Sequence, residues 1–457
     1  MLFRGRGPKP WGTILLERFH HPAQVVVTGF LVTILTGTLL LSLPAATEEP
    51  GSASLVDALF TATSAVCVTG LVTVDFETHW SAFGEVVILA LVQVGGLGLM
   101  TMATLFAILL SRRLGLRARL AAQAETKTLR MTDVRRVVRR VVVFSAVSEA
   151  LVAAVLTGRF LAAYDEPPGR AVYLGVFHGV SAFNNAGFTL WPDGLARFAG
   201  DPWIILTVCA AVVVGGLGFP VVFELARRWR RPGSWSVLTR ITLATTVVLL
   251  AGGALVLSAV EWDNPGTLGA LPESDRAAVG LMLSVMPRSG GLNAVDVAQM
   301  RTESWLATDV LMFIGGGSAG TAGGIKVTTF GLLGFVVWAE MRGETHVNVG
   351  HRRLSEGVQR QAIAIVLLGF AMVTAGTFTL LAMTSHTLDR VLFEVVSAFG
   401  TVGLSTGITA GLPTAAQLVL VALMFVGRIG PLTFATALAL RERTRRYELP
   451  EERPIVG

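Results

Sequence analysis

Charged side chains and cysteines are scarce in this chain. Asp, Glu, Lys and Arg make up 15% of its 457 residues, whereas a soluble domain is about one quarter charged. The two cysteines, Cys67 and Cys209, lie in apolar or loop-like segments and lack the spacing of a metal site. These shortages argue against a soluble globular domain, a disulfide framework and a cysteine-ligated metal.

The hydrophobic segments also hold few ionisable side chains. They contain no cluster of His, Asp and Glu such as a membrane-embedded enzyme would need, so we expect no catalytic residues and no cofactor in this chain. His178 stands in an apolar run, where a buried histidine with satisfied hydrogen bonds is expected. The net charge of +6 could suggest a nucleic-acid partner. However, the basic residues fall between hydrophobic runs, which is typical of membrane topology signals, and we expect no nucleic acid.

Apolar residues dominate what is present: 52% of the chain is hydrophobic, and the mean hydropathy is +0.64. Many windows of about 20 apolar residues can cross a bilayer as helices. The first, 25–43, follows Arg4, Arg6 and Lys9 in the manner of a signal peptide. Its length instead suits a first spanning helix.

The hydrophobic segments form four triplets, each with a long span, a short amphiphilic run and a second long span. The predicted long spans are 24–43 and 83–110, 137–163 and 203–225, 237–260 and 305–338, and 358–383 and 415–440. The short runs are 55–66, 171–183, 277–286 and 388–399. We therefore divide the chain into repeats at 1–112, 113–231, 232–345 and 346–457.

Two glycine landmarks recur at nearly constant spacing in the four repeats. Each short run is followed by a loop with a central glycine: Gly70, Gly187, Gly291 and Gly403. A glycine cluster lies 24 to 28 residues further on, beginning at Gly95, Gly215, Gly315 and Gly427. Because two independent landmarks repeat together, chance similarity among apolar segments is a poor explanation.

Charge orients the repeats. Basic residues concentrate at 112–140, 227–231, 342–360 and 441–446, whereas the loops at 48–49, 75–77, 165–166 and 261–275 are acidic or mixed. By the positive-inside rule both termini are cytoplasmic and the glycine loops open toward the outside. This orientation requires the short runs to enter the membrane and return on the same side.

Four equivalent re-entrant loops predict an ion pore. Irregular backbone at membrane depth is tolerated only where it is buried in protein or lines water. Loops meeting on a pseudo-fourfold axis can replace the hydration shell of a cation with rings of carbonyl oxygens. The negative ends of the preceding short helices would favour a cation there.

These features resemble the Trk/Ktr/HKT superfamily of potassium transporters. The resemblance covers nearly the whole chain, and its most specific segments are 65–71, 400–407, 315–326 and 427–430. It implies an all-α membrane protein of four M1–P–M2 repeats, with eight transmembrane helices and four re-entrant pore helices around one pore. The early start of the first repeat looks more like the Ktr branch (KtrB) than the longer TrkH.

The resemblance assigns K⁺ selectivity to the loop backbones, whose carbonyls would bind K⁺. The implied filter residues are Val68, Thr69, Gly70, Asn185, Ala186, Gly187, Ser289, Gly290, Gly291, Thr401, Val402 and Gly403. Glycine at position 70 favours potassium, since sodium-selective plant relatives often carry serine there. The third loop departs from the usual Thr-Ala-Gly-Phe, which leaves its local packing open.

By the same analogy, this chain forms a homodimer in the inner (cytoplasmic) membrane on a KtrA/TrkA-like cytoplasmic ring. ATP or ADP is then expected only on that partner, and Na⁺ is a possible activator.

The cluster of the third repeat continues into a Gly-rich stretch at 315–326. Six of its first ten residues are Gly, which would break a helix at a cost of about 1 kcal/mol per glycine relative to alanine. A phosphate loop would need lysine directly after the last glycine, but Ile325 precedes Lys326. We expect a mobile gate below the filter, with tight helix packing as the alternative.

The predicted gate residues are Gly315, Gly316, Gly317, Ser318, Gly320, Thr321, Gly323, Gly324, Lys326 and Arg428. Arg428 stands where earlier repeats have glycine, and a charge at membrane depth usually serves function. In the pore it would repel cations; a structural ion pair with Glu394 or another pore-helix acid is the alternative. For Lys326, snorkelling to the cytoplasmic surface is equally compatible.

Several polar residues near the loops have two interpretations. Asp75, Asp193 and Asp296 follow loop glycines and are either capping residues or part of a cation-attracting vestibule. Asn184 and Asn185 are expected to brace the second loop. The alternative function is a Na⁺- or H⁺-coupled secondary transporter with rocking halves, but such a protein would need two related bundles and acids at the midplane.

Overall fold

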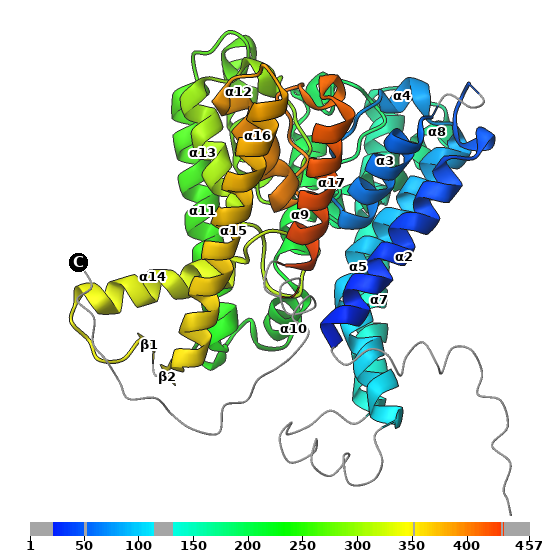
Figure 1. Cartoon of the computed structure of the whole chain (residues 1–457). Helices are drawn as coiled ribbons and strands as arrows, with labels where there is room; N and C mark the ends of the chain where they lie inside the picture. The colour runs from blue at the N-terminus through cyan, green and yellow to red at the C-terminus, as the bar shows by residue number, and fades with distance from the viewer. Residues whose placement is uncertain (1–21, 50–52, 114–130, 351, 431–432, 434–457) are drawn as a thin grey trace, which may run out of the picture.

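The computed structural model describes residues 22–49, 53–113, 131–350, 352–430 and 433 (Figure 1). The predicted N-terminal basic residues, much of the basic loop after the first repeat and the end of the fourth span lie outside the described residues. The basic tail at 441–446 also lies outside them.

Each repeat forms a long helix, a short helix and a second helix, as the sequence predicts. In the first half of the chain these are α2 (Pro22–Leu41), α3 (Leu55–Cys67) and α5 (Ala82–Arg113), then α7 (Met131–Ala163), α8 (Pro168–Phe183) and α9 (Pro202–Gly216). In the second half they are α11 (Val237–Glu261), α12 (Glu273–Val285) and α13 (Thr302–Phe313), then α15 (Glu356–Met383), α16 (Leu388–Gly400) and α17 (Thr414–Ile429).

The remaining elements are short or lie at the ends of the bundle. They are α4 (Phe76–His79), α10 (Phe219–Arg228), α14 (Val327–Met341) and the antiparallel pair β1 (Asn348–Val349) and β2 (Arg352–Arg353). Single 3₁₀ turns form at η1 (Pro44–Ala46), η2 (Ala196–Phe198), η3 (Pro232–Ser234), η4 (Leu268–Ala270), η5 (Val297–Gln299) and η6 (Thr409–Gly411).

The repeats pack in a closed ring. Within each repeat the long first helix packs on the short helix and on the second helix. Between repeats, each second helix packs on the next short helix: α5 on α8, α9 on α12, α13 on α16, and α17 back on α3. This cyclic order confirms the predicted pseudo-fourfold arrangement and brings the ends of the four short helices together at the centre.

By length and apolar character, three described helices can span a bilayer unbroken: Arg136–Ala163, Val237–Glu261 and Glu356–Met383. The pair α9 and α10 makes a fourth if its two parts count as one span. The short helices are apolar but have only 13 to 16 residues, which is fewer than the roughly 20 that a spanning helix needs.

The predicted span 203–225 is formed by two helices, α9 and α10, and not by one continuous helix. The chain bends by 99° between α9 and α10, at Gly218, whose φ is +91°. The carbonyls of Gly215 and Gly216 do not continue the helix, because they accept hydrogen bonds from the backbone N–H groups of Thr321 (3.3 Å) and Gly317 (2.7 Å). Pro220 has no N–H to offer the carbonyl of Gly216, and a segment about one hundred residues later in the chain bonds the carbonyls at this helix end.

The second span of the third repeat is interrupted, as its glycines predict. Helix α13 ends at Phe313 and α14 begins at Val327. Figure 1 shows α14 projecting sideways from the lower part of the bundle instead of continuing α13. We call the intervening residues 314–326 the gate loop.

Candidate pore

The four loops after the short helices share one backbone conformation. In each, a non-glycine residue with positive φ lies two positions before a glycine with positive φ. These pairs are Val68 (57°) and Gly70 (95°), Asn185 (60°) and Gly187 (71°), Ser289 (70°) and Gly291 (69°), and Thr401 (49°) and Gly403 (96°). Residues with a side chain seldom adopt positive φ, so its recurrence shows four equivalent turns.

Each loop is fastened to its own short helix. In three repeats the N–H of the residue before the glycine donates to the carbonyl of a serine five residues earlier: Thr69 to Ser64 (2.8 Å), Ala186 to Ser181 (2.8 Å) and Val402 to Ser397 (2.9 Å). In two of them the serine hydroxyl also accepts from the glycine N–H, at 3.0 Å for Ser64 and 3.1 Å for Ser397.

The third loop departs from this scheme. Helix α12 ends at Val285, six residues before Gly291, and Val285 occupies the place of the serine. The N–H of Gly291 donates to the carbonyl of Met286 at 3.2 Å. The sequence expectation of unusual packing at this loop is thus met, while the glycine keeps its conformation.

The four glycines form a ring of direct neighbours. A Cβ added to Gly70 would lie 2.9 Å from Cα of Gly187, one on Gly187 3.0 Å from Cα of Gly291, and one on Gly403 3.1 Å from Cα of Gly70. A Cβ on Gly291 would overlap the carbonyl oxygen of Val402. The sequence-predicted loops therefore meet at one centre, with no space for side chains at their glycines.

A cavity of about 430 Å³ opens on one side of this ring. Loop residues of all four repeats line it, among them Gly70, Gly187, Gly291 and Leu404. Asp75 and Asp296 line it as well, and both also cap short helical turns. Asp193 instead pairs with Arg197 at 2.7 Å. For Asp75 and Asp296 the capping interpretation is confirmed, and their position at the cavity is compatible with the vestibule interpretation.

The glycine clusters of the second helices accommodate the ends of the short helices. A Cβ on Gly95 would overlap the carbonyl oxygen of Val66, and one on Gly215 would overlap that of Phe183. Gly427 has the same relation to Phe399. In each of these repeats the carbonyl belongs to the residue four positions before the loop glycine. This contact explains why the spacing between loop glycine and glycine cluster is nearly constant.

The gate loop packs against three of the four glycine loops, for which we use the name filter loops after their predicted role. The hydroxyl of Thr321 donates to the side-chain oxygen of Asn185 at 2.8 Å. The N–H of Gly323 donates to the hydroxyl of Ser289 at 3.2 Å. A Cβ on Gly323 would overlap the side chain of Thr401. The loop thus contacts the second, third and fourth filter loops directly.

Backbone hydrogen bonds hold the gate loop in this place. Gly315 donates to the carbonyl of Ile325 at 2.8 Å and Val327 to that of Gly316 at 3.0 Å, which closes the base of the loop. Gly317 and Thr321 are bonded to α9. A phosphate loop needs free N–H groups pointing at the anion, so these bonds weigh against that alternative.

Arg428 does not form the ion pair with Glu394 that was the alternative to a gating role. The Arg428 side chain is 2% exposed, and its guanidinium donates to the carbonyl of Thr321 and, at 2.8 Å, to that of Gly95. The carboxylate of Glu394 instead accepts from the N–H of Thr406 (2.9 Å) and the hydroxyl of Thr409 (2.8 Å). Arg428 therefore ties the gate loop to the first and fourth repeats.

Lys326 does not snorkel toward the cytoplasmic surface. Its ammonium group donates to the carbonyl of Ala322, within the gate loop itself. This bond spans the last residues of the gate loop, so Lys326 stabilises the shape of the loop instead of extending into solvent.

Asn184 braces the second loop, as expected, whereas the side-chain oxygen of Asn185 accepts from Thr321 of the gate loop. The side-chain nitrogen of Asn184 donates to Gln93 (2.9 Å) and to Glu149 (3.0 Å). His178 is buried and satisfied: its Nδ1 lies 2.8 Å from the carbonyl of Leu174, and its ring stacks on Trp191. Cys67 and Cys209 are buried free thiols.

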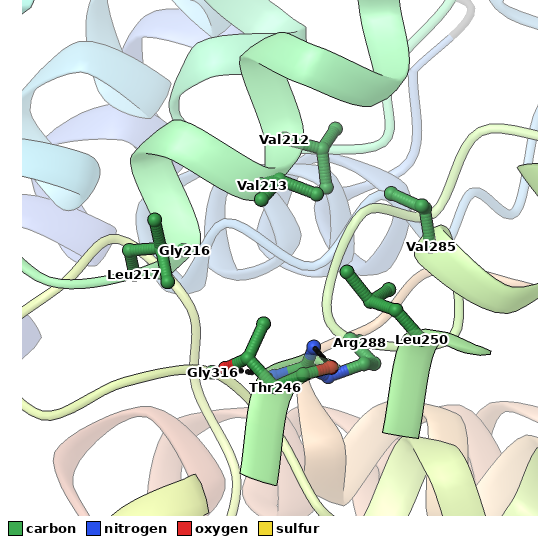
Figure 2. Close-up of a pocket in the computed structure, with 9 residues that line it drawn as sticks. All are labelled: Val212, Val213, Gly216, Leu217, Thr246, Leu250, Val285, Arg288 and Gly316. Atoms are coloured by element: carbon green, nitrogen blue, oxygen red, sulfur yellow. Dashed lines mark hydrogen bonds between the residues drawn. The ribbon is translucent and has the colours of Figure 1, made fainter. Parts of the chain in front are cut away.

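Sequence reasoning missed Arg288. This side chain is 7% exposed and lies beside a cavity of about 20 Å³ that Gly316 also lines. Figure 2 shows its guanidinium directed at Thr246, whose hydroxyl is 3.3 Å away. The sequence did hold a signal for Arg288, because this arginine directly follows Pro287 between the third short helix and its loop. Gln93 and Glu149 were also missed, although the charge of Glu149 inside the predicted span 137–163 was a detectable signal.

Comparisons with known proteins agree with this geometry. Residues 13–446 match the family model of the TrkH cation transport proteins. The chain is 39% identical over 427 residues to the Ktr system potassium uptake protein B of Bacillus subtilis (strain 168), covering 93% of this chain and 95% of that protein. It is 35% identical over 435 residues to the protein of the same name from Vibrio alginolyticus, covering 95% and 94%.

A solved structure has the same fold. The potassium transporter TrkH from Vibrio parahaemolyticus matches 93% of this chain and 86% of its own, with a TM-score of 0.73 at 17% sequence identity. The family match spans nearly the whole chain, and both relatives are more than 30% identical. This protein therefore belongs to the TrkH family of cation transport proteins and is KtrB/TrkH-like.

Proposed function

We propose that this protein takes up K⁺ across the cytoplasmic membrane through a selectivity filter formed by its four loops. It transports without catalysing a reaction. The observation that carries the proposal is the ring of Gly70, Gly187, Gly291 and Gly403, which leaves only backbone groups at its centre. Carbonyl oxygens there would replace the hydration shell of a monovalent cation. The similarity to potassium uptake proteins supports K⁺ as the ion.

The membrane potential would drive uptake. Moving one charge through 100 mV is worth about 2.3 kcal/mol. The vestibule acids Asp75 and Asp296 would raise the local cation concentration at the outer end of the filter. K⁺ would then enter the cytoplasm without the cotransport of a second ion.

The gate loop would close the pore on the cytoplasmic side of the filter. Its contacts with Asn185, Ser289 and Thr401 support a position in the path of an ion that leaves the proposed filter. Arg428 would contribute a positive barrier and hold the loop through Thr321. Opening then requires the loop to leave these partners.

We further propose that a separate cytoplasmic nucleotide-binding ring controls this gate, and that the protein is a homodimer with both termini in the cytoplasm. The support is the similarity to Ktr system proteins and the distribution of basic residues. Nucleotide would bind to the ring and not to this chain. Na⁺ is a candidate activator by the same analogy.

Na⁺- or H⁺-coupled transport by two rocking halves is the alternative function. Rocking requires two bundles that move against each other. The packing favours the pore instead, since four equivalent contacts close the ring and Arg428 bonds the fourth repeat to the first and third.

The test is cation uptake by a potassium-deficient cell that expresses this chain together with its own regulatory subunit. We expect restored growth at low external K⁺, and K⁺ uptake that tenfold excess Na⁺ leaves largely unaffected. Uptake of Na⁺ in preference to K⁺, or no K⁺ uptake with normal membrane insertion, would contradict the proposal.

A further inference from the structure

Ser289 joins the gate loop to a backbone carbonyl of the neighbouring filter loop. Its side chain is fully buried. The Ser289 hydroxyl donates to the carbonyl oxygen of Thr401 at 2.7 Å. The same hydroxyl accepts from the N–H of Gly323 at 3.2 Å. One hydroxyl therefore connects the third filter loop, the fourth filter loop and the gate loop.

We propose that Ser289 is a hydrogen-bond relay that weakens K⁺ binding in the fourth filter loop while the gate loop is closed. The inference rests on the proposed filter and gate, and adds to them a direct coupling between gate position and ion affinity. The relay residue is a positioning residue, since it acts on the ion through Thr401.

The direction of the relay follows from what a hydroxyl can do. A serine hydroxyl has one proton to donate and lone pairs that accept. When the N–H of Gly323 occupies a lone pair, the proton remains directed at the carbonyl of Thr401, and each bond polarises and strengthens the other. A carbonyl oxygen that accepts this bond is a poorer ligand for K⁺, because part of its electron density is engaged.

The packing at this corner leaves the relay little freedom in the closed state. A Cβ on Gly323 would overlap the side chain of Thr401, and one on Gly324 would lie 3.3 Å from Cα of Gly400. The gate loop is thus pressed against the start of the fourth filter loop. When it withdraws, Ser289 loses its donor, its hydroxyl can rotate, and the Thr401 carbonyl becomes available to the ion.

The coupling is reciprocal. If the closed gate loop lowers the affinity of the filter for K⁺, then bound K⁺ must by the same factor disfavour the closed loop. A filter loaded from outside would therefore promote its own opening, and an empty filter would favour closure.

The test measures K⁺ affinity by isothermal titration calorimetry of the full chain in lipid nanodiscs, in a Na⁺-free buffer. Ser289→Ala is made both in the intact chain and in a variant that lacks residues 316–323. In the intact chain we expect K⁺ to bind about 2- to 12-fold more tightly, the value of one hydrogen bond. In the loop deletion the same substitution should leave the affinity within twofold.

Equal effects of Ser289→Ala in both backgrounds, or no effect in either, would overturn the relay. Ser42→Ala is the matched control, because the Ser42 hydroxyl donates to the carbonyl of Thr38 at the end of α2, outside the gate loop and the four glycine loops. It should leave K⁺ affinity unchanged. If Ser289→Ala does not yield a monodisperse protein, the loop deletion alone decides: tighter K⁺ binding than in the intact chain supports the relay, and unchanged or weaker binding contradicts it.

The same titration separates the relay from the proposed function. If the unsubstituted chain binds K⁺ more tightly than Na⁺ but Ser289→Ala has no effect, the relay fails and the filter stands. If the unsubstituted chain binds Na⁺ in preference to K⁺, the proposed function fails, and the relay fails with it.

Discussion

The backbone of Gly427 packs directly on the carbonyl oxygen of Phe399, so that a Cβ at Gly427 would overlap that oxygen. The second helix of the fourth repeat thus touches the last turn of its pore helix without an intervening side chain. This contact fixes the distance between the pore helix and the wall of the pore.

Gly427→Ala should therefore destabilise the protein. The added methyl group must push α17 away from α16, and overpacking of this kind costs about 1 to 3 kcal/mol. We expect a lower Tm of the purified protein. Gly252→Ala in α11 is the matched control, because a Cβ there meets nothing within 4 Å. A Tm equal to that of this control would show that the contact can be relaxed without cost.

Gly70→Ser should reduce K⁺ selectivity. The φ of Gly70 is +95°, and a Cβ there would lie 2.6 Å from the carbonyl oxygen of Ala186, so the substitution displaces a filter carbonyl. We expect the ratio of K⁺ to Na⁺ uptake to fall by at least about tenfold, the effect of roughly 1.4 kcal/mol.

Gly407→Ser tests whether backbone strain alone is enough to reduce K⁺ selectivity. Gly407 has a φ of +88° in the loop that follows Gly403, but a Cβ there meets nothing within 4 Å. Uptake by this variant should retain its selectivity. Equal selectivity of the Gly70 and Gly407 variants would remove the first loop from the filter.

Arg428→Gln should raise ungated flux. The substitution removes both the positive charge and the two bonds that tie Thr321 and Gly95 together. We expect faster K⁺ leak from loaded proteoliposomes without the regulatory subunit. Arg228→Gln, on the exposed end of α10, should leave the leak unchanged. A leak that stays at the control level would show that Arg428 does not restrain the gate.

Glu394→Gln should destabilise the fourth filter loop. The Glu394 carboxylate is fully buried and accepts hydrogen bonds from Ser405, Thr406 and Thr409. An amide has one acceptor oxygen fewer, and leaving a buried donor unpaired costs about 1 to 3 kcal/mol. We expect a lower Tm that added K⁺ partly restores. The exposed Glu340→Gln provides the control, and an equal Tm for both would contradict the bracing role.

The repeat architecture could be predicted from sequence because it depends on local rules. Apolar length separates spanning from re-entrant helices, and Gly70, Gly187, Gly291 and Gly403 mark turns that require positive φ. The constant spacing between these turns and the glycine clusters was visible in the sequence, but its cause was not. The cause is packing: Gly95, for example, lies directly against the carbonyl oxygen of Val66.

What sequence could not provide depends on contacts between distant segments. Pro220 leaves the carbonyl of Gly216 without its helical donor, so the sequence marks the end of α9, but it does not show that Gly317 bonds this carbonyl instead. Arg428 was recognised as unusual, but its partners are backbone carbonyls, which carry no sequence signal. Ser289 and Glu394 acquire their roles only when the third and fourth loops meet.

The most direct test of the account is K⁺ accumulation by proteoliposomes in which an imposed voltage, negative inside, is the sole driving force. The account predicts that the unsubstituted chain and the Arg428→Gln variant, tested in parallel, both accumulate K⁺. Accumulation should continue until the K⁺ concentration gradient balances the imposed voltage, without any Na⁺ or H⁺ gradient. Accumulation that appears only when a Na⁺ or H⁺ gradient is supplied would contradict it and identify a coupled transporter.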